Sequence, residues 1–221
     1  MSVTSLLTSA QYRFGQGPEN IRFQDDFYSA LNNSQNEFAI SRSWGFLRTT
    51  ANVTATHATR ATALPSNFGK MYDVPNALVI TSPTASSGGL IELMPQEQWQ
   101  ADYWEDGTTE GTPAYAYISG SSIYWSSVPD ATYVVSMTYY KIPTTIADSS
   151  TAITIPDVYG EVLQKLIWRR LQDSGYSSVA ELQISDADIA SLMGKAARDD
   201  VRKYGGMTMN LSSDTYTRRT I

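Results

Sequence analysis

Apolar residues in the first part of the chain recur at spacings of three and four. Within GPENIRFQDDFYSALNNSQNEFAISRSW, the recurring positions are Phe23, Phe27, Ala30, Leu31, Ser34 and Phe38. This is the period of one face of an amphipathic helix. Gly17–Pro18 breaks the chain before the stripe, and Asp25 and Asp26 fall in the first turns, where the helix dipole favours anions. The pattern predicts one helix, preceded before Gly15 by a less regular segment or an arm.

From Trp44 to about Pro156 the pattern changes to short runs rich in Thr, Val, Tyr and Ile, interrupted by Gly, Pro, Asn and Asp. Such runs are typical of strands and turns. WGFLRTTANVTATHATRATALP predicts one or two strands, and MYDVPNALVITS and GGLIELMP predict two more. TPAYAYISGSSIYWSSVPDATYVVSMTYYKIP predicts three strands, broken at Gly120 and at Pro129–Asp130. Between strands, PQEQWQADYWED predicts one short helix.

After Pro156 the period returns to that of helices. The first apolar stripe comprises Val158, Val162, Leu163, Leu166, Ile167 and Leu171. Gly175 ends this predicted helix. A second helix is predicted from Ser185, whose hydroxyl caps it, with Asp188 three residues on as in a capping box. Its apolar face comprises Ile189, Leu192, Met193, Ala196 and Ala197. Gly205 and Gly206 stop it.

Helices on both sides of a strand-rich segment favour one helical body, formed by the two ends of the chain, with a β module inserted in it. An antiparallel sheet closed on itself, as a sandwich or small barrel, buries both halves of the module. The predicted class is α+β with an extended C-terminal tail. The predicted divisions are 1–43 for an arm and helix, 44–155 for the β module, 156–206 for the C-terminal helices and 207–221 for a docking tail.

The net charge and the residue composition argue against several classes of function. The net charge of the 221 residues is −6, which argues against an overall basic surface for nucleic acids but allows local basic patches. The absence of cysteine excludes disulfides and thiol catalysis. Because there is also only one histidine, we expect no metal site and no cofactor. The N-terminal MSVTSLLTSAQYR predicts no secretory signal, and no apolar run is long enough to span a membrane.

Few side chains are candidates for catalysis. His57 has no local partner for general-base chemistry and is predicted on a strand surface. Asp186 and Asp188 suit the first turn of a capped helix better than a cation site. A cluster of carboxylates comprises Glu97, Asp102, Glu105, Asp106 and Glu110. It predicts a solvated acidic face or a surface for a basic partner, since glycoside hydrolysis needs a matched pair in a cleft. The 14 Tyr and 5 Trp keep a sugar-binding module open.

Four motifs occur in a characteristic order between residues 20 and 204. They are Leu-Pro-x-x-Phe at Leu64–Phe68, Pro-Asp-Ala-x-Tyr at Pro129–Tyr133, Tyr-Tyr-Lys-x-Pro at Tyr139–Pro143 and Ile-Pro-Asp-x-Tyr at Ile155–Tyr159. In this order, and between the helices predicted above, the motifs resemble the head-to-tail adaptor (connector) proteins of short-tailed bacteriophages.

The resemblance implies a structural virion protein and not an enzyme. Adaptors of this kind form a homo-oligomeric ring, typically of twelve copies, that docks on the portal protein and joins it to tail tube, nozzle or fibre proteins. It implies a location at the head-to-tail interface of the virion, assembly in the host cytoplasm, no membrane, and genomic DNA that passes through without sequence-specific binding. The alternative is a carbohydrate- or protein-binding β module of a phage tail appendage. A hydrolase that uses the acidic cluster ranks third.

The C-terminal region is the predicted partner interface. The last helix is basic along one run, and the segment MNLSSDTYTRRTI spaces apolar anchors among polar residues. Such a segment suits a groove or a sheet edge of another chain. The residues predicted to dock on the portal protein are Lys195, Arg198, Arg202, Lys203, Tyr204, Met207, Met209, Leu211, Tyr216, Arg218, Arg219 and Ile221.

Overall fold

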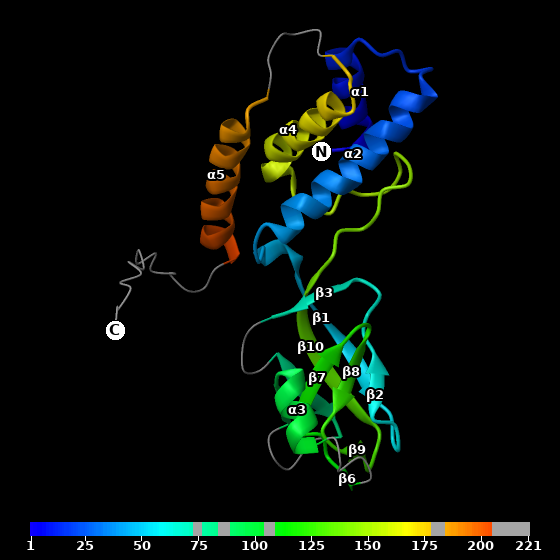
Figure 1. Ribbon diagram of the computed structural model, residues 1–221, viewed down its shortest axis with the longest axis vertical. Helices are drawn as coiled ribbons and strands as arrows, with labels where there is room; N and C mark the ends of the chain where they lie inside the picture. Colours follow the sequence, from blue (N-terminus) through cyan, green and yellow to red (C-terminus); the bar gives the residue numbers. More distant parts are fainter. Residues whose placement is uncertain (73–76, 84–88, 104–108, 178–183, 205–221) are drawn as a thin grey trace, which may run out of the picture.

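The computed structural model describes residues 1–221 apart from 73–76, 84–88, 104–108, 178–183 and 205–221. Figure 1 shows α1, α2, α4 and α5 at one end of the long axis, and the strands together with α3 at the other. We call the connecting residues, 41–47 and 142–145, the neck. The predicted α+β class, a helical body with an inserted barrel-like module, is confirmed. The predicted tail lies outside the described residues.

The helical body is held by the pairing of α2 (Ile21–Ile40) with α4 (Gly160–Asp173). The apolar stripe predicted for α2 is buried in full, and Asn20 caps the helix by accepting a hydrogen bond from the Phe23 N–H. Glu37 joins the two helices, because its carboxylate oxygens bind Arg169 at 2.7 Å and Arg170 at 2.6 Å. The N- and C-terminal parts of the chain therefore share one core.

The segment before Gly15 is a regular helix, so the prediction of an irregular arm is wrong. α1 (Val3–Phe14) begins with a capping box between Ser2 and Ser5. It buries one residue per turn, namely Val3, Leu6, Ala10 and Phe14. Gly15 ends it in the left-handed conformation, with φ of 62°. The stripe is so narrow and so diluted by Ser and Thr that its period escapes notice in the sequence.

The start of the first C-terminal helix also differs from the prediction. Residues Asp157–Tyr159 form a 3₁₀ turn, η2, ahead of α4. The tighter turn rotates Val158 out of the apolar stripe, and its side chain is 63% exposed. The other five predicted residues of the stripe are buried. α5 (Asp186–Tyr204) is capped by Ser185, whose hydroxyl accepts from the Asp188 N–H as predicted.

The β module is a nearly closed sheet. Its elements are η1 (Gly45–Leu47), β1 (Arg48–Ala55), β2 (Ala61–Ala63), β3 (Phe68–Met71), β4 (Leu78–Ser82), β5 (Leu90–Leu93), α3 (Gln96–Tyr103), β6 (Glu110–Gly111), β7 (Tyr115–Ser119), β8 (Ser122–Trp125), β9 (Val128–Pro129) and β10 (Tyr133–Lys141). The strand order is β1-β10-β4-β5-β7-β8-β2, with β3 also on β10 and β6 paired with β9.

One feature of this sheet corrects the expectation of a purely antiparallel module. β5 and β7 are parallel, and so are the short strands β6 and β9. The chain between β5 and β7 includes α3, and a crossover of this kind brings the second strand back in the same direction as the first. α3 lies where PQEQWQADYWED predicts a helix, and it packs its buried Trp99 against β7.

Two hydrophobic cores meet at the neck. One fills the helical body and the other fills the sheet. At the end of the helical core next to the neck, Trp44 stacks on Phe38 with ring centroids 4.3 Å apart. The indole Nε1–H of Trp44 also donates to the Phe38 carbonyl oxygen at 2.6 Å. Phe46 and Tyr159 complete this aromatic cluster, which anchors the start of the β module to the helices.

Candidate functional site

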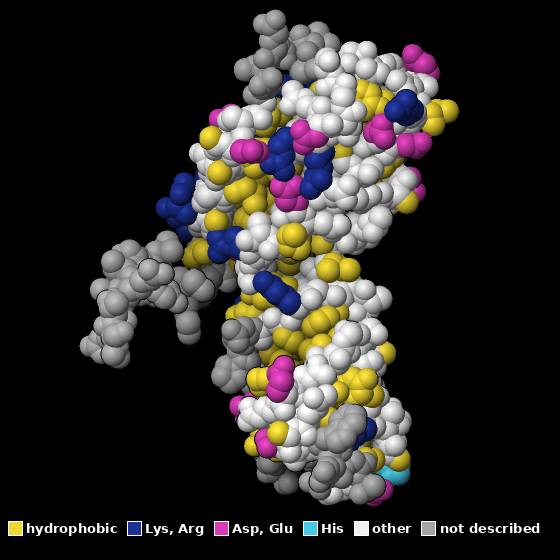
Figure 2. Space-filling model, in the orientation of Figure 1, with side chains coloured by type: hydrophobic (Ala, Val, Ile, Leu, Met, Phe, Trp, Pro, Cys, Tyr) yellow, Lys and Arg dark blue, Asp and Glu magenta, His cyan; other side chains and the backbone are white. Residues whose placement is uncertain are grey.

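The outer face of α5 carries a row of positive charge. Lys195, Arg198 and Arg202 lie at helical spacings of three and four, and Lys203 follows. All four side chains are exposed. Within the described residues none of them makes an ion pair, whereas Arg169 pairs with Glu37 and Asp186, and Arg170 pairs with Glu37. Figure 2 shows dark-blue side chains at the edge of the molecule where α5 lies in Figure 1.

The opposite face fixes the C-terminal end of α5 to the neck. Asp200 is only 3% exposed, and its Oδ2 accepts a hydrogen bond from the Gly45 N–H at 2.9 Å. Tyr204 packs so closely on Gly45 that a Cβ at position 45 would lie 2.2 Å from the Tyr204 Cβ. Since Gly45 belongs to η1, which leads directly into β1, the basic face is held in a defined orientation to both bodies.

Substituting Gly45→Ala tests this contact. The new methyl group has no room beside Tyr204, so we expect the end of α5 to shift and the free energy of unfolding to fall by about 1–3 kcal/mol. Gly194→Ala is the matched control, because it lies within α5 and its Cβ would meet nothing closer than the Arg198 guanidinium at 3.9 Å. We expect Gly194→Ala to stabilise the chain by about 0.5–1 kcal/mol. Urea unfolding of both variants decides between a tight and a loose contact.

A buried hydroxyl lies beside this joint. Tyr159 is 2% exposed, and its hydroxyl has no hydrogen-bond partner among the described residues. Burial, followed by the negative charge of Asp200, raises the pKa of Tyr159 to about 12. The neutral phenol is therefore the form that the folded protein accommodates.

The raised pKa predicts a loss of stability in alkali. A phenol whose pKa is higher in the folded chain than in the unfolded chain stabilises the fold below pH 10, and this contribution disappears as the pH approaches 12. We expect Tyr159→Phe to leave the free energy of unfolding at pH 7 unchanged or higher and to lose less of it between pH 10 and 12. Urea titrations across that range measure the difference; parallel curves for the two proteins would contradict the assignment.

A second group of cations lies on β1 and β3, close to the neck. Arg48 donates to the Tyr72 hydroxyl at 3.2 Å, and Lys70 lies 5.4 Å from the centre of the Tyr140 ring. The two tyrosine rings meet edge to face at 5.6 Å. Burial and then Tyr72 raise the pKa of Tyr140, which Arg48 partly offsets. The sequence prediction missed this cluster because its members come together only through strand pairing.

The predicted interface residues divide into two groups. Lys195, Arg198, Arg202 and Lys203 share the exposed side of α5, while Tyr204 packs on Gly45. The remaining predicted residues, Met207, Met209, Leu211, Tyr216, Arg218, Arg219 and Ile221, lie outside the described residues. Gly45 and Asp200 are the additions that sequence reasoning missed. The one local signal is an aspartate four residues after Ala196, on the buried side of an otherwise apolar helix face.

The other candidates from the sequence are dispersed. His57 is exposed in the turn that follows β1, not on a strand, and Glu97, Asp102 and Glu110 are exposed on α3 and β6. The other two members of the predicted acidic cluster, Glu105 and Asp106, lie outside the described residues. No group of three or more His, Asp or Glu side chains in the described part of the chain is placed to hold a metal ion. Trp99, 1% exposed, packs against Tyr117 and beneath the Arg60 guanidinium, so it is a core residue.

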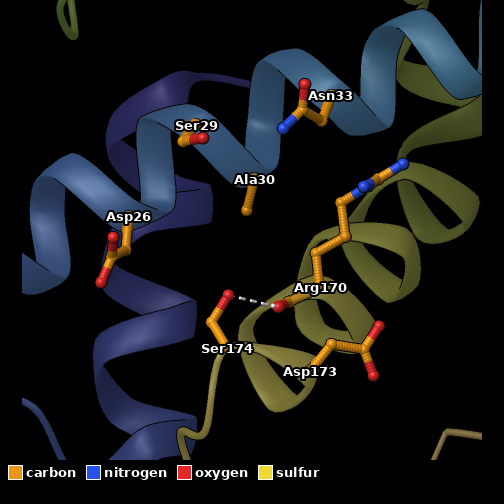
Figure 3. Close-up of a pocket in the computed structure, with 7 residues that line it drawn as sticks. All are labelled: Asp26, Ser29, Ala30, Asn33, Arg170, Asp173 and Ser174. Carbon is orange, nitrogen blue, oxygen red and sulfur yellow. Dashed lines mark hydrogen bonds between the residues drawn. The ribbon is translucent and has the colours of Figure 1, made fainter.

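A polar depression of about 220 Å³ lies between α2 and α4. Figure 3 shows seven of the residues that line it. Several of its side chains are already engaged within the protein. Asp26 accepts from the Tyr176 hydroxyl at 2.6 Å, Arg170 pairs with Glu37, and Ser174 donates to the Arg170 carbonyl at 2.9 Å. The depression is therefore part of the polar contacts that join the two helices.

The chain thus combines a helical body and a β module, joined by an aromatic neck, with an exposed basic face on α5. A sequence model of the family described as SU10 adaptor protein matches residues 1–211. The chain belongs to this family of structural phage adaptors, and it is a virion component. The match includes α1, which the resemblance over residues 20–204 left out. No curated protein matches the chain significantly. No described helix has the length and apolar character needed to cross a bilayer.

Proposed function

We propose that the chain is the head-to-tail adaptor of a short-tailed, podovirus-like phage. In this role it docks on the portal protein and connects it to tail tube, nozzle or fibre proteins. The observation that carries the proposal is the exposed basic face of α5. Asp200 and Tyr204, on the opposite face of the helix, contact Gly45 in the neck and so fix the direction of the basic face. Membership of the adaptor family supports portal and tail proteins as the partners.

The proposed assembly is a ring of twelve copies with a channel for DNA. Around a closed ring each copy repeats the same contact, so a modest interface per copy gives tight overall binding. A net charge of −6 suits a channel through which DNA slides, because a basic wall would hold its phosphates. In this proposal residues 1–43 and 156–206 act as one body, 44–155 as the inserted module and 207–221 as the docking tail.

Reversing charge on α5 tests the docking face. We expect Lys195→Glu combined with Arg198→Glu to weaken binding to the purified portal ring at least tenfold, because each substitution replaces attraction by repulsion across the interface. The weakening should shrink as salt is raised. Arg22→Glu combined with Lys165→Glu changes the net charge equally but places the new charges on α2 and α4. Equal binding by the two double variants, measured by interferometry on immobilised portal, would rule out α5 as the docking face.

A further inference from the structure

β1 has one edge on which no strand is paired in the described chain. It pairs with β10 over eight consecutive residues without a bulge, and it is the terminal strand of the sheet. Thr138 of β10 turns its N–H to Ala77 and its carbonyl to Tyr72, both away from β1. Because antiparallel residues alternate in the direction of their hydrogen bonds, the partner residue Thr50 faces away from β10 as well. The same alternation leaves the N–H and C=O groups of Arg48 and Asn52 on the open edge.

The opening lies between β1 and β2, the two ends of the sheet. The seam narrows at one end, where the Thr62 hydroxyl donates to the Thr54 carbonyl at 3.0 Å. Beyond this contact, no ladder joins β1 to β2 in the described chain. Ala51 on β1 and Leu64 just after β2 pack on the core of the module but stay partly exposed. A strand in the seam would meet unpaired backbone groups along β1 and an apolar floor.

Long, regular edge strands are normally blunted by proline, a bulge or cover from another element. β1 contains no proline, its register is unbroken, and Arg48 is its single charged residue. β10, in contrast, is paired on both sides. The exposed edge of β1 is therefore suited to accept an additional strand.

We propose that residues 207–212 of a second copy of this chain add to the open edge of β1, which leaves residues 213–221, with Tyr216, Arg218, Arg219 and Ile221, to dock on the portal protein. The segment MTMNLS alternates apolar and polar residues, which is the pattern of a half-buried strand. Its Met207, Met209 and Leu211 would cover Ala51 and Leu64 while its polar residues join the exposed face. Six extended residues span about 20 Å, which suits the open part of β1.

The position of α5 favours a second copy over the same chain. α5 ends at Tyr204, against the neck, and the segment follows after Gly205–Gly206. In Figure 1, α5 lies at the left of the molecule, whereas β2, which borders the seam, lies at the right. The segment that follows α5 therefore starts on the side of the neck away from the seam of its own chain, and a neighbouring copy in the proposed ring can present its seam there. The inference thus rests on the proposed ring and identifies one of its contacts.

A labelled peptide of residues 205–221 tests strand addition without portal protein. We expect it to bind the dilute full-length chain, as detected by fluorescence anisotropy. A strand on an edge uses the N–H groups of alternate residues for its hydrogen bonds. A peptide N-methylated at 207, 209 and 211 and a peptide N-methylated at 208, 210 and 212 should therefore differ in their affinity for the chain. One set should weaken binding at least about tenfold and the other should leave it nearly unchanged. Absence of binding, or an equal effect of both sets, would overturn strand addition.

Disulfide cross-linking locates the edge and the donor, since the natural chain contains no cysteine. The chain carrying Asn52→Cys and Asn210→Cys should form bonds between copies, seen as a ladder on a non-reducing gel, once assembled on the portal ring. Glu92→Cys with Asn210→Cys is the control, because Glu92 is exposed on a strand paired on both sides. A bond within single chains, or equal ladders from both variants, would overturn the second-copy assignment. A chain that binds the peptide but forms no ring would instead contradict the proposed function.

Discussion

A chain that lacks residues 207–221 is expected to fold normally and to lose its binding to the portal protein. Both hydrophobic cores are built from residues no later than Ala197, so the truncation removes no described core contact. In a ring the tail contact is repeated by every copy, and its loss is therefore multiplied in the overall affinity. Thermal melting reports the fold, and interferometry on an immobilised portal ring reports the binding, which we expect to fall by at least a hundredfold.

The control for this truncation is the full-length chain with its last 15 residues in scrambled order. It keeps the length, the charge and the composition of the tail but destroys the spacing of its apolar residues. We expect the scrambled chain to bind as weakly as the truncated one. Binding equal to that of the natural chain in both variants would show that the tail has no part in docking.

The second large effect is expected from Trp44→Ala. Trp44 is 1% exposed, stacks on Phe38 and donates a hydrogen bond to the Phe38 carbonyl. Removing the indole leaves a cavity where the neck meets the helical core, and such losses cost about 3–5 kcal/mol in the free energy of unfolding. Because small domains have only about 5–15 kcal/mol of stability, we expect a chain close to unfolding at 37 °C. Urea denaturation measures the loss.

Trp44→Phe separates packing from hydrogen bonding at the same position. The smaller ring keeps an aromatic contact with Phe38 but lacks the N–H, so part of the loss should remain, including about 1 kcal/mol for the hydrogen bond. A loss below 1 kcal/mol for Trp44→Ala would mean that the neck does not depend on this aromatic cluster. A free energy of unfolding that is much lower for Trp44→Ala than for Trp44→Phe would confirm that it does.

The parts of the fold that could be predicted are those with a local period. α2, α4 and α5 each place large apolar residues at spacings of three and four, and Ser185 marks the start of α5 by its own chemistry. The strand-rich segment is similarly marked by alternation and by turns at Gly120 and Pro129. These signals are properties of neighbouring residues, so they need no knowledge of the tertiary structure.

The features that escaped prediction depend on distant residues. Gly45 and Asp200 lie 155 positions apart, and although Asp200 stands out on the apolar face of α5, nothing near it in the sequence identifies Gly45 as its partner. The cation cluster of Arg48 and Lys70 exists only through the register of β1, β3 and β10. For the site, then, the basic residues of α5 were visible in the sequence, whereas the contacts that orient them were not.

Native mass spectrometry of the chain mixed with the purified portal ring shows whether the chain forms a ring on the portal. We expect one discrete complex in which twelve copies of the 24.4 kDa chain are added to the portal, with few partly filled rings. The N52C/N210C cross-link should form within that complex. A chain that stays monomeric in the presence of the portal ring would contradict the claim that this protein is a ring-forming head-to-tail adaptor.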